Sequence, residues 1–269
     1  MAFVEEAIGT IVFVTIIGGG FALMERKWPL VKQRTFRKGW FTDALHLFFT
    51  GFLDRAFQFV GIVIAFLLVG WWAPATLAGA IQSQPLALQY LEAFLLANVL
   101  GYWAHRLSHT VPLLWRFHKV HHSSQHLDWL AGVRRHPLEQ TWSGLLVGAP
   151  LIFFGFTLFQ VAAVDIVLGF WGIFLHANTR FNGKRIRHLI ATPAYHHWHH
   201  SDDPMRYNTN YSLFPWIDGL FGTKFISDER ATTFGVPGYE PGGYVKQMIE
   251  PFRRVERRVA FIERSKSPD

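Results

Sequence analysis

Long stretches without charge constrain the fold of this chain more than any other feature of its sequence. No charged side chain occurs from Ala56 to Leu91, and the block from Thr141 to Leu175 contains only Asp165. Apolar stretches of this length cross bilayers as helices, because a helix pairs its backbone polar groups within the segment. Charged residues make up 17% of the sequence, below the roughly 25% of soluble domains. We therefore predict an all-α, polytopic, integral membrane helical bundle.

Breaks in the apolar segments predict four to five membrane spans. Proline, glycine and charged residues separate the segments, and such residues end helices or form turns. The last block is too long for one helix, so a turn at Gly155–Gln160 is expected to fold it into a hairpin. The predicted spans are Ile8–Met24, Asp43–Trp72, Leu86–Ala104 and the two arms of the hairpin Thr141–Leu175.

Basic residues are sorted between the two sides of the predicted membrane. If residues 25–42, 105–140 and 177–269 lie on one side, every Lys and Arg except Arg55 lies there. Loops rich in Lys and Arg stay in the cytoplasm, whereas a soluble protein with buried helices would not sort its charges in this way. The net charge of +7 then reflects topology and attraction to anionic membrane lipids. No nucleic-acid partner is needed to explain it.

Histidines cluster on the predicted cytoplasmic side, where thirteen of the fourteen lie between His105 and His200. Three segments repeat a helical spacing: His105–His109 is an i, i+4 pair, while His118–His122 and His196–His200 contain i, i+3, i+4 triplets. Residues so spaced project from one face of a helix. Crowded imidazoles without a metal would be costly whenever one became protonated, and neutral imidazole is a common metal ligand.

The number of histidines indicates two metal ions rather than one. His176 and His136, at the ends of predicted spans, join the eight histidines of the three segments, and one zinc ion takes only four ligands. The absence of cysteine excludes thiolate sites. An all-imidazole shell suits iron, copper, nickel or zinc; iron fits oxygen chemistry, and zinc can replace it in purified protein. The candidate metal ligands are His105, His109, His118, His121, His122, His136, His176, His196, His199 and His200.

Ligating imidazoles usually donate their second N–H to a carboxylate or a carbonyl group. The candidates for this role, each of which has an ordinary loop or capping role as an alternative, are Asp128, Glu139, Asn178, Asp202, Asp203 and Asn208. The histidines expected to lie outside the metal sites are His46, His126, His188 and His197.

These motifs resemble the fatty acid hydroxylase/sterol desaturase superfamily of membrane di-iron enzymes. Its HxxxH, HxxHH and HxxHH boxes match the three histidine segments in order and spacing, within a similarity over about residues 90–225. The flanking motifs that also resemble the family are Ser123-Ser124, Asp128-Trp129, Arg134, His136–Glu139, His176-Ala-Asn178, Thr192-Pro193, Asn210-Tyr211 and Trp216–Thr223.

The resemblance implies a fold, a chemistry and partners. The fold is a helical bundle in the membrane with a cytosolic helical cap that holds two iron ions, liganded by the histidines named above. The chemistry is O2-dependent hydroxylation, desaturation or ether cleavage of a lipid-like substrate (sterol, fatty acyl or alkylglycerol type) that enters from the bilayer. No cytochrome domain accompanies the core, so a separate reductase, ferredoxin-like or cytochrome-type protein is expected to supply electrons. A bacterial inner membrane, with the metal site facing the cytoplasm, is the expected location.

Three regions are predicted. Residues 1–85 form N-terminal spans and a basic cytosolic loop, residues 86–225 the catalytic core, and residues 226–269 a tail. Apolar and arginine side chains alternate in the tail from Tyr244 to Lys266, which predicts a basic amphipathic helix on the membrane surface or against the cap. Aromatic side chains, including Trp71 and Trp72, are candidates for lining a lipid channel, although aromatics are also common at membrane interfaces.

Two other classes of protein compete with an oxygenase. A membrane zinc hydrolase would pair histidines with a catalytic glutamate, but none of the three histidine segments contains one. A metal transporter would place its polar ligands at mid-membrane along a pathway, and a haem protein would need only two histidines. The candidate ligands of this chain instead gather at the ends of the predicted spans.

Overall fold

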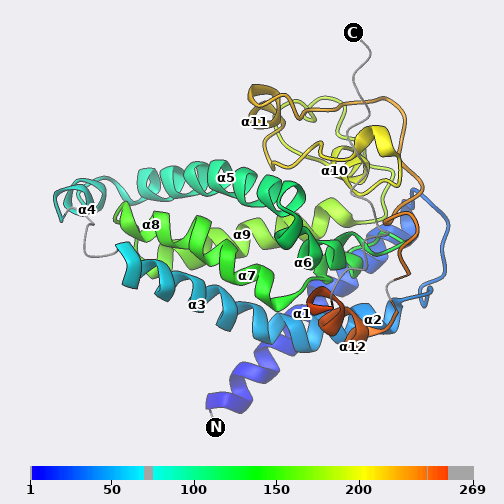
Figure 1. Ribbon diagram of the computed structural model, residues 1–269, viewed down its shortest axis with the longest axis horizontal. Coiled ribbons are helices and arrows are strands. Elements are labelled where there is room, and N and C mark those ends of the chain that lie inside the picture. Colours follow the sequence, from blue (N-terminus) through cyan, green and yellow to red (C-terminus); the bar gives the residue numbers. More distant parts are fainter. Residues whose placement is uncertain (1, 70–74, 241, 254–269) are drawn as a thin grey trace.

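The computed structural model describes residues 2–69, 75–240 and 242–253, and in these ranges it contains helices and no strand (Figure 1). The all-α prediction is therefore confirmed. The helices before the second histidine segment are α1 (Ala2–Lys27), α2 (Trp40–Leu45), η1 (His46–Thr50), α3 (Gly51–Val69), α4 (Ala75–Gln82) and α5 (Leu86–Thr110). The remaining helices are α6 (Pro112–His122), η3 (Ala131–Val133), α7 (Pro137–Ser143), η4 (Gly144–Gly148), α8 (Ala149–Phe153), α9 (Leu158–His176), α10 (Pro193–His199), η5 (Pro204–Arg206), α11 (Pro215–Leu220), α12 (Tyr244–Ile249) and η6 (Glu250–Phe252).

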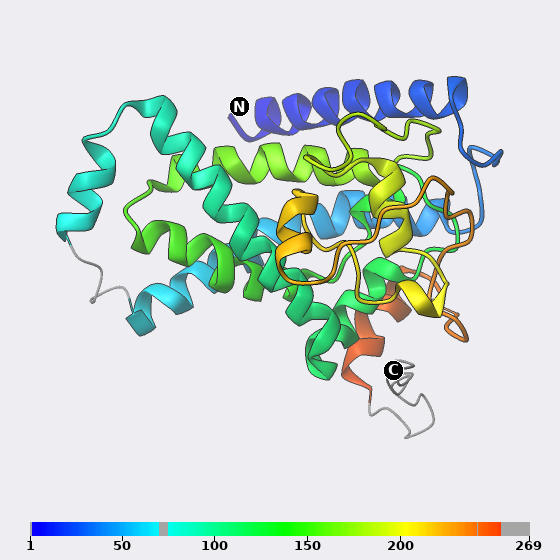
Figure 2. The same cartoon turned by 90° about the horizontal axis from the view of Figure 1, so that it is seen from above.

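The helices form an elongated bundle with a cap at one end. In Figure 1, α3, α5, α9 and the α7–α8 segment run side by side, and the short helices α6, α10 and α12 gather with the loops at the right. Figure 2 shows α1 along the outside of α9, where Phe21 packs against Phe170. The cap is therefore built from short helices and loops, whereas longer helices form most of the bundle.

Close crossing of α3 with the α7–η4 segment depends on two glycines. A Cβ atom at Gly61 would collide with the backbone oxygen of Thr141, and one at Gly144 would collide with the backbone oxygen of Gln58. Small residues at such positions let two helix backbones approach closely, as is typical of helices packed in membranes. These two close approaches bring α3 and the α7–η4 segment together.

The predicted hairpin is confirmed, with its turn just before α9. Gly155 has a φ of 101°, a conformation that glycine adopts without strain. Thr157 then begins α9, since its hydroxyl accepts from the backbone N–H of Gln160 while the Gln160 side chain accepts from the backbone N–H of Thr157. This capping box satisfies donors that helix termini otherwise leave unpaired.

The described residues contain one helix that is long and apolar enough to cross a membrane alone, α9 (Leu158–His176). The segments Trp40–Thr50 and Leu53–Leu68 reach the same standard together, with a bend of 48° between them. The number of four to five spans therefore stays a prediction. Trp71, Trp72 and residues 254–266 of the predicted tail helix lie outside the described residues.

The described part of the C-terminal tail packs against the cap. Gln247 of α12 is fully buried and its side-chain oxygen accepts from Nε2 of His46 at 2.9 Å. Glu250 lies 3.7 Å from the amino group of Lys119 on α6. Val245 and Phe252 remain exposed. Packing on the cap, one of the two predicted arrangements, is thus observed up to residue 253. The arrangement on the membrane surface and the division into three regions stay predictions.

Candidate metal centre

Nine of the ten candidate ligands come together inside the cap, in two groups. In each group the potential ligand atoms lie within 4.8 Å of one another. The five-histidine group consists of His105, His109, His118, His122 and His199. The four-histidine group consists of His121, His176, His196 and His200.

Both histidine triplets are divided between the two groups. On α6, His118 and His122 belong to the five-histidine group, while His121 belongs to the four-histidine group. On the α10 segment the division is reversed, with only His199 in the five-histidine group. Both helices have proline as the first residue, where its fixed φ suits the helix and its missing N–H costs nothing. Each triplet therefore bridges two neighbouring sites.

Backbone and carboxylate acceptors fix the orientation of five imidazoles. Because a carbonyl oxygen only accepts, the Nδ1 atom that contacts it carries the proton, and Nε2 keeps its lone pair. The hydrogen bonds are His105 Nδ1 to Tyr211 O (2.9 Å), His118 Nδ1 to Glu139 Oε1 (2.6 Å), His121 Nδ1 to Arg134 O (2.9 Å), His176 Nδ1 to Gly172 O (2.6 Å) and His199 Nδ1 to Thr209 O (2.6 Å). Metal-ligating histidines typically show this arrangement.

The free nitrogens lie close to one another, an arrangement that fits a cation between them. Nε2 of His176 lies 3.1 Å from Nε2 of His121 and 3.0 Å from Nε2 of His200. In the His121–His176 pair both protons are on Nδ1, so neither Nε2 can donate. With metal–nitrogen distances of about 2.0–2.1 Å, adjacent imidazole nitrogens around one ion lie roughly 3.0–3.4 Å apart. The four-histidine group therefore fits a metal ion.

The five-histidine group fits an ion for a second reason. The Nε2 atoms of His105, His109 and His199 are buried and have no hydrogen-bond partner within the described part of the chain. A buried polar atom without a partner costs free energy, and a metal ion would supply the missing interaction for all three. Nε2 of His118 and Nε2 of His122 also lie close, at 3.2 Å.

The environment keeps these imidazoles neutral. Burial, followed by repulsion from neighbouring imidazoles, lowers the pKa of His122, His199 and His200 well below 6.5. The same causes lower the pKa of His121 and His196. The neutral ring is the form that binds a metal ion, so the sites are ready for metal at neutral pH.

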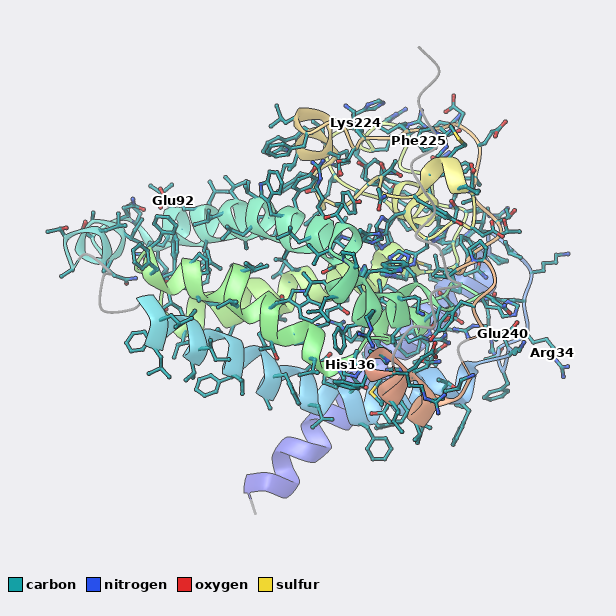
Figure 3. The ribbon with its side chains drawn as sticks, viewed as in Figure 1. Arg34, Glu92, His136, Lys224, Phe225 and Glu240 are labelled. Carbon is teal, nitrogen blue, oxygen red and sulfur yellow. The ribbon has the colours of Figure 1, made fainter. Side chains whose placement is uncertain are left out.

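His136, the tenth candidate ligand, lies outside both groups. Its Nδ1 accepts from the backbone N–H of Leu138 at 3.2 Å, and its Nε2 donates to the carbonyl of Met248 at 3.1 Å. The ring packs on Phe117 and Phe252, and Figure 3 shows it beside α12. Both ring nitrogens are thus occupied, and His136 joins α7 to the tail instead of the metal centre.

The remaining histidines also lie outside the two groups, as the sequence suggested. His197 is fully buried and its Nε2 donates to the carbonyl of Ala177 at 3.1 Å. His46 pairs with Gln247 and Thr50. Their polar partners are ordinary protein groups, so burial alone does not make a histidine a candidate ligand.

Of the acidic and amide residues considered as partners of the ligands, only Glu139 contacts one in the described chain. The other four oriented imidazoles donate to backbone carbonyls, those of Tyr211, Arg134, Gly172 and Thr209. Sequence reasoning missed them because any residue type can supply a carbonyl.

A buried carboxylate shapes the loop that carries two of these carbonyls. Asp218 is fully buried and accepts from the backbone N–H groups of Tyr211 and Ser212 and from the hydroxyls of Tyr195 and Thr223. These four bonds fold the loop back on α11. The carbonyls of Thr209 and Tyr211 are thereby held toward His199 and His105, respectively.

Comparison with known proteins agrees with this site. The fatty acid hydroxylase family profile matches residues 90–223. The ornithine lipid hydroxylase OlsE of Rhizobium tropici is 33% identical over 178 residues, which cover 65% of this chain and 53% of the relative. The alkylglycerol monooxygenase of Homo sapiens is 26% identical over 158 residues, covering 56% and 35%, respectively. The very-long-chain aldehyde decarbonylase CER1 of Arabidopsis thaliana is 29% identical over 193 residues, covering 66% and 28%.

The fold and site define an all-helical protein with two adjacent polyhistidine groups. Together with these matches, they show that the chain belongs to the fatty acid hydroxylase/sterol desaturase superfamily, as its histidine boxes predicted. The chain spans about half the length of OlsE and about a third of the human monooxygenase. No solved structure gives a significant match.

Proposed function

We propose that this chain is a membrane-embedded di-iron oxygenase that hydroxylates a lipid. The observation that carries the proposal is the pair of histidine groups. In one group the Nε2 atoms of His121 and His176 face each other while both protons are on Nδ1, and in the other three buried Nε2 atoms have no hydrogen-bond partner among the described residues. The named relatives include a lipid hydroxylase and monooxygenases, so the family supports an oxidoreductase that modifies lipids. Hydroxylation is the reaction proposed first, with desaturation and ether cleavage as alternatives.

Nine imidazoles suit two iron ions that are to activate oxygen. Iron accepts five or six ligands, so groups of five and four histidines leave positions free for O2. When bound and supplied with electrons, the ions would provide O2 activation, with one oxygen atom inserted into a C–H bond and the other leaving as water. Two electrons and two protons complete this balance. The chain itself holds the ions, keeps the imidazoles neutral and excludes bulk water by burial.

The apolar helices support a substrate from the bilayer. The exposed side chains of α9 include Phe159, Val167 and Phe170, and α9 ends at His176 of the four-histidine group. In our proposal the protein crosses a bacterial inner membrane four to five times, with the metal centre on the cytoplasmic side. Lipids surround the bundle, and a separate protein supplies electrons. Because OlsE acts on ornithine lipids by name, an ornithine lipid belongs in the first substrate panel.

Metal content of detergent-purified protein tests the proposal. The test variant is His121→Ala with His199→Ala, which removes one imidazole from each group; the control is His126→Ala with His188→Ala, outside both groups. Near two iron ions per chain in the wild type and the control, but not in the test variant, would support the dimetal site. Lipid extracts incubated with the iron-loaded protein, a reductase system and 18O2 should then gain one labelled oxygen atom, measured by mass spectrometry.

Other outcomes of the same experiment would change the proposed class. One tightly held zinc ion per chain would favour a hydrolase. A well-folded wild-type protein that binds no metal under any loading condition would overturn the proposal. Labelled water instead of labelled O2 as the source of the oxygen atom would overturn the oxygenase while leaving the metal sites intact.

A further inference from the structure

A cluster of four buried charges lies next to the metal centre. The side chains of Arg37, Asp43, Asp128 and Arg134 are at most 9% exposed. Arg37 binds Asp128 through two nitrogens, at 2.7 and 2.5 Å, and also binds Asp43 at 2.8 Å. Arg134 binds the other oxygen of Asp43 through Nε. Two of the four residues precede the segment that matches the family profile, so the family match assigns them no role.

The cluster contacts the four-histidine group at His121. Arg134 is held by Asp43 through its side chain, while its backbone carbonyl accepts from Nδ1 of His121 at 2.9 Å. The position of this carbonyl decides which nitrogen of His121 is protonated and where Nε2 points. Nε2 of His121 in turn lies 3.1 Å from Nε2 of His176.

The cluster reaches the same group a second time, at His176. Asp128 Oδ1 accepts from the backbone N–H of Ala131, the first residue of η3 (Ala131–Val133). Gly132 of η3 lies against the imidazole of His176, and a Cβ atom there would be 2.9 Å from Cγ of the ring. The same carboxylate is held by Arg37. Through Asp128, Arg37 therefore fixes the position of η3, against which His176 packs.

Three imidazoles of the five-histidine group are oriented by other parts of the chain. His105 and His199 donate to carbonyls of the loop that Asp218 holds, and His118 donates to Glu139. None of these acceptors belongs to the charge cluster. The α6 helix carries ligands of both groups, so a general loosening of α6 would affect both ions, whereas a positioning role of the cluster affects only one.

We infer that Arg37, through Asp43 and Asp128, is a positioning residue for the four-histidine group, and that it sets the affinity of this group for its metal ion. The inference rests on the metal binding in the proposed function and is independent of the reaction. Burying four charges is seldom a gain in stability over apolar packing, but a closed network of charged hydrogen bonds fixes the geometry of the groups attached to it.

Arg37→Lys tests the inference because it keeps the charge and removes the bidentate contact. We expect one of two ions to be bound 10- to 100-fold more weakly, the usual effect of changing a group that orients a ligand. Purified full-length protein, stripped of metal, is titrated with Co2+ in competition with a chromophoric chelator. Circular dichroism confirms that the variant is folded. The matched control Asp218→Asn should also weaken the binding of one ion, but in this variant it should be the ion of the five-histidine group.

Double variants identify the affected site. Arg37→Lys combined with His121→Ala should bind no less Co2+ than His121→Ala alone, because both changes act on one site. Arg37→Lys combined with His109→Ala should weaken both ions. If Arg37→Lys does not fold, the charge-balanced variant Arg37→Gln with Asp128→Asn replaces it in the same series.

Three results for the folded Arg37 variant would overturn the inference. Both ions could be bound with unchanged affinity, both could be bound equally more weakly, or only the ion of the five-histidine group could be bound more weakly. A wild type that binds no Co2+ or Fe2+ would instead refute the proposed function itself, so the two failures are distinguishable.

Discussion

His118 donates its Nδ1–H to a carboxylate oxygen of Glu139 at 2.6 Å, and no other proposed ligand in the described chain has a carboxylate partner. The second oxygen of Glu139 is buried without a hydrogen-bond partner among the described residues. A charged acceptor raises the basicity of an imidazole more than a neutral carbonyl does. Among the candidate ligands of the five-histidine group, His118 is thus the one that is oriented by a carboxylate.

Glu139→Gln should weaken metal binding at this group. The amide of the variant can still accept from His118, but the loss of the carboxylate charge reduces the basicity of Nε2. We therefore expect the five-histidine group to bind its metal ion about 10-fold more weakly. Chelator competition measures this affinity. Glu240→Gln is the matched control, because its side chain is 73% exposed and distant from the ligands in sequence and contacts; Figure 3 shows it at the edge of the molecule. Equal affinities in wild type and Glu139→Gln would remove the proposed role of the carboxylate.

Gly132→Ala should displace His176. The added methyl group would lie 2.9–3.1 Å from three atoms of the imidazole, and overpacking of this kind costs about 1–3 kcal/mol. We expect the protein to retain the five-histidine ion and to bind the other at least 10-fold more weakly. Gly169→Ala is the control, since nothing lies within 4 Å of its added Cβ atom. A Gly132→Ala variant that binds both ions with wild-type affinity would show that the imidazole of His176 can shift without loss of binding.

Asp218→Asn should destabilise the loop that orients His105 and His199. An amide nitrogen in place of one carboxylate oxygen would face donors rather than acceptors, so we expect a loss of about 2–4 kcal/mol in the free energy of unfolding. Thermal or denaturant unfolding in detergent, followed by tryptophan fluorescence, measures the change. Asp228→Asn, at an exposed side chain that pairs with Arg187, should change stability by less than about 1 kcal/mol. Similar values for both variants would contradict the structural role of Asp218.

Acidification should destabilise the metal-free protein. The folded-state pKa values of His122, His199 and His200 lie below 6.5, so below pH 6.5 the unfolded chain binds more protons than the folded one. Their contribution to stability is therefore complete above pH 6.5 and is lost as the pH falls, by at most about 1.4 kcal/mol per pH unit for each histidine. Melting midpoints of chelator-treated protein between pH 8 and pH 5 should decrease. A midpoint that rises on acidification would mean that these rings are already charged.

His136→Ala should keep both metal ions and loosen the C-terminal tail. The variant loses the bond to Met248 and the packing on Phe117 and Phe252, which we expect to cost about 1–3 kcal/mol. Elemental analysis should still give two ions per chain, while limited proteolysis should cut the tail faster than in the wild type. Loss of an ion from the folded variant would indicate that His136 is a metal ligand, as the sequence predicted.

The sequence indicated much of this protein because its decisive signals are local. Helical spacing shows that His118, His121 and His122 share one face of a helix, whatever that helix packs against. Apolar runs and their breaks predicted α9 and the turn before it, and the three histidine boxes identified the superfamily. Each of these signals is a short pattern of neighbouring residues, and the superfamily follows from the order of three such patterns along the chain.

Tertiary structure alone decided how the candidate ligands are grouped and oriented. Which imidazoles of α6 face those of α10 depends on the packing of segments about 80 residues apart, so the division into groups of five and four could not be predicted. The same holds for the exclusion of His136 and for the role of Arg37, a loop residue whose buried partner Asp128 lies 91 positions away. Side-chain spacing along a helix is set by backbone geometry, whereas metal coordination is set by distances between chain segments, and only the folded protein fixes those distances.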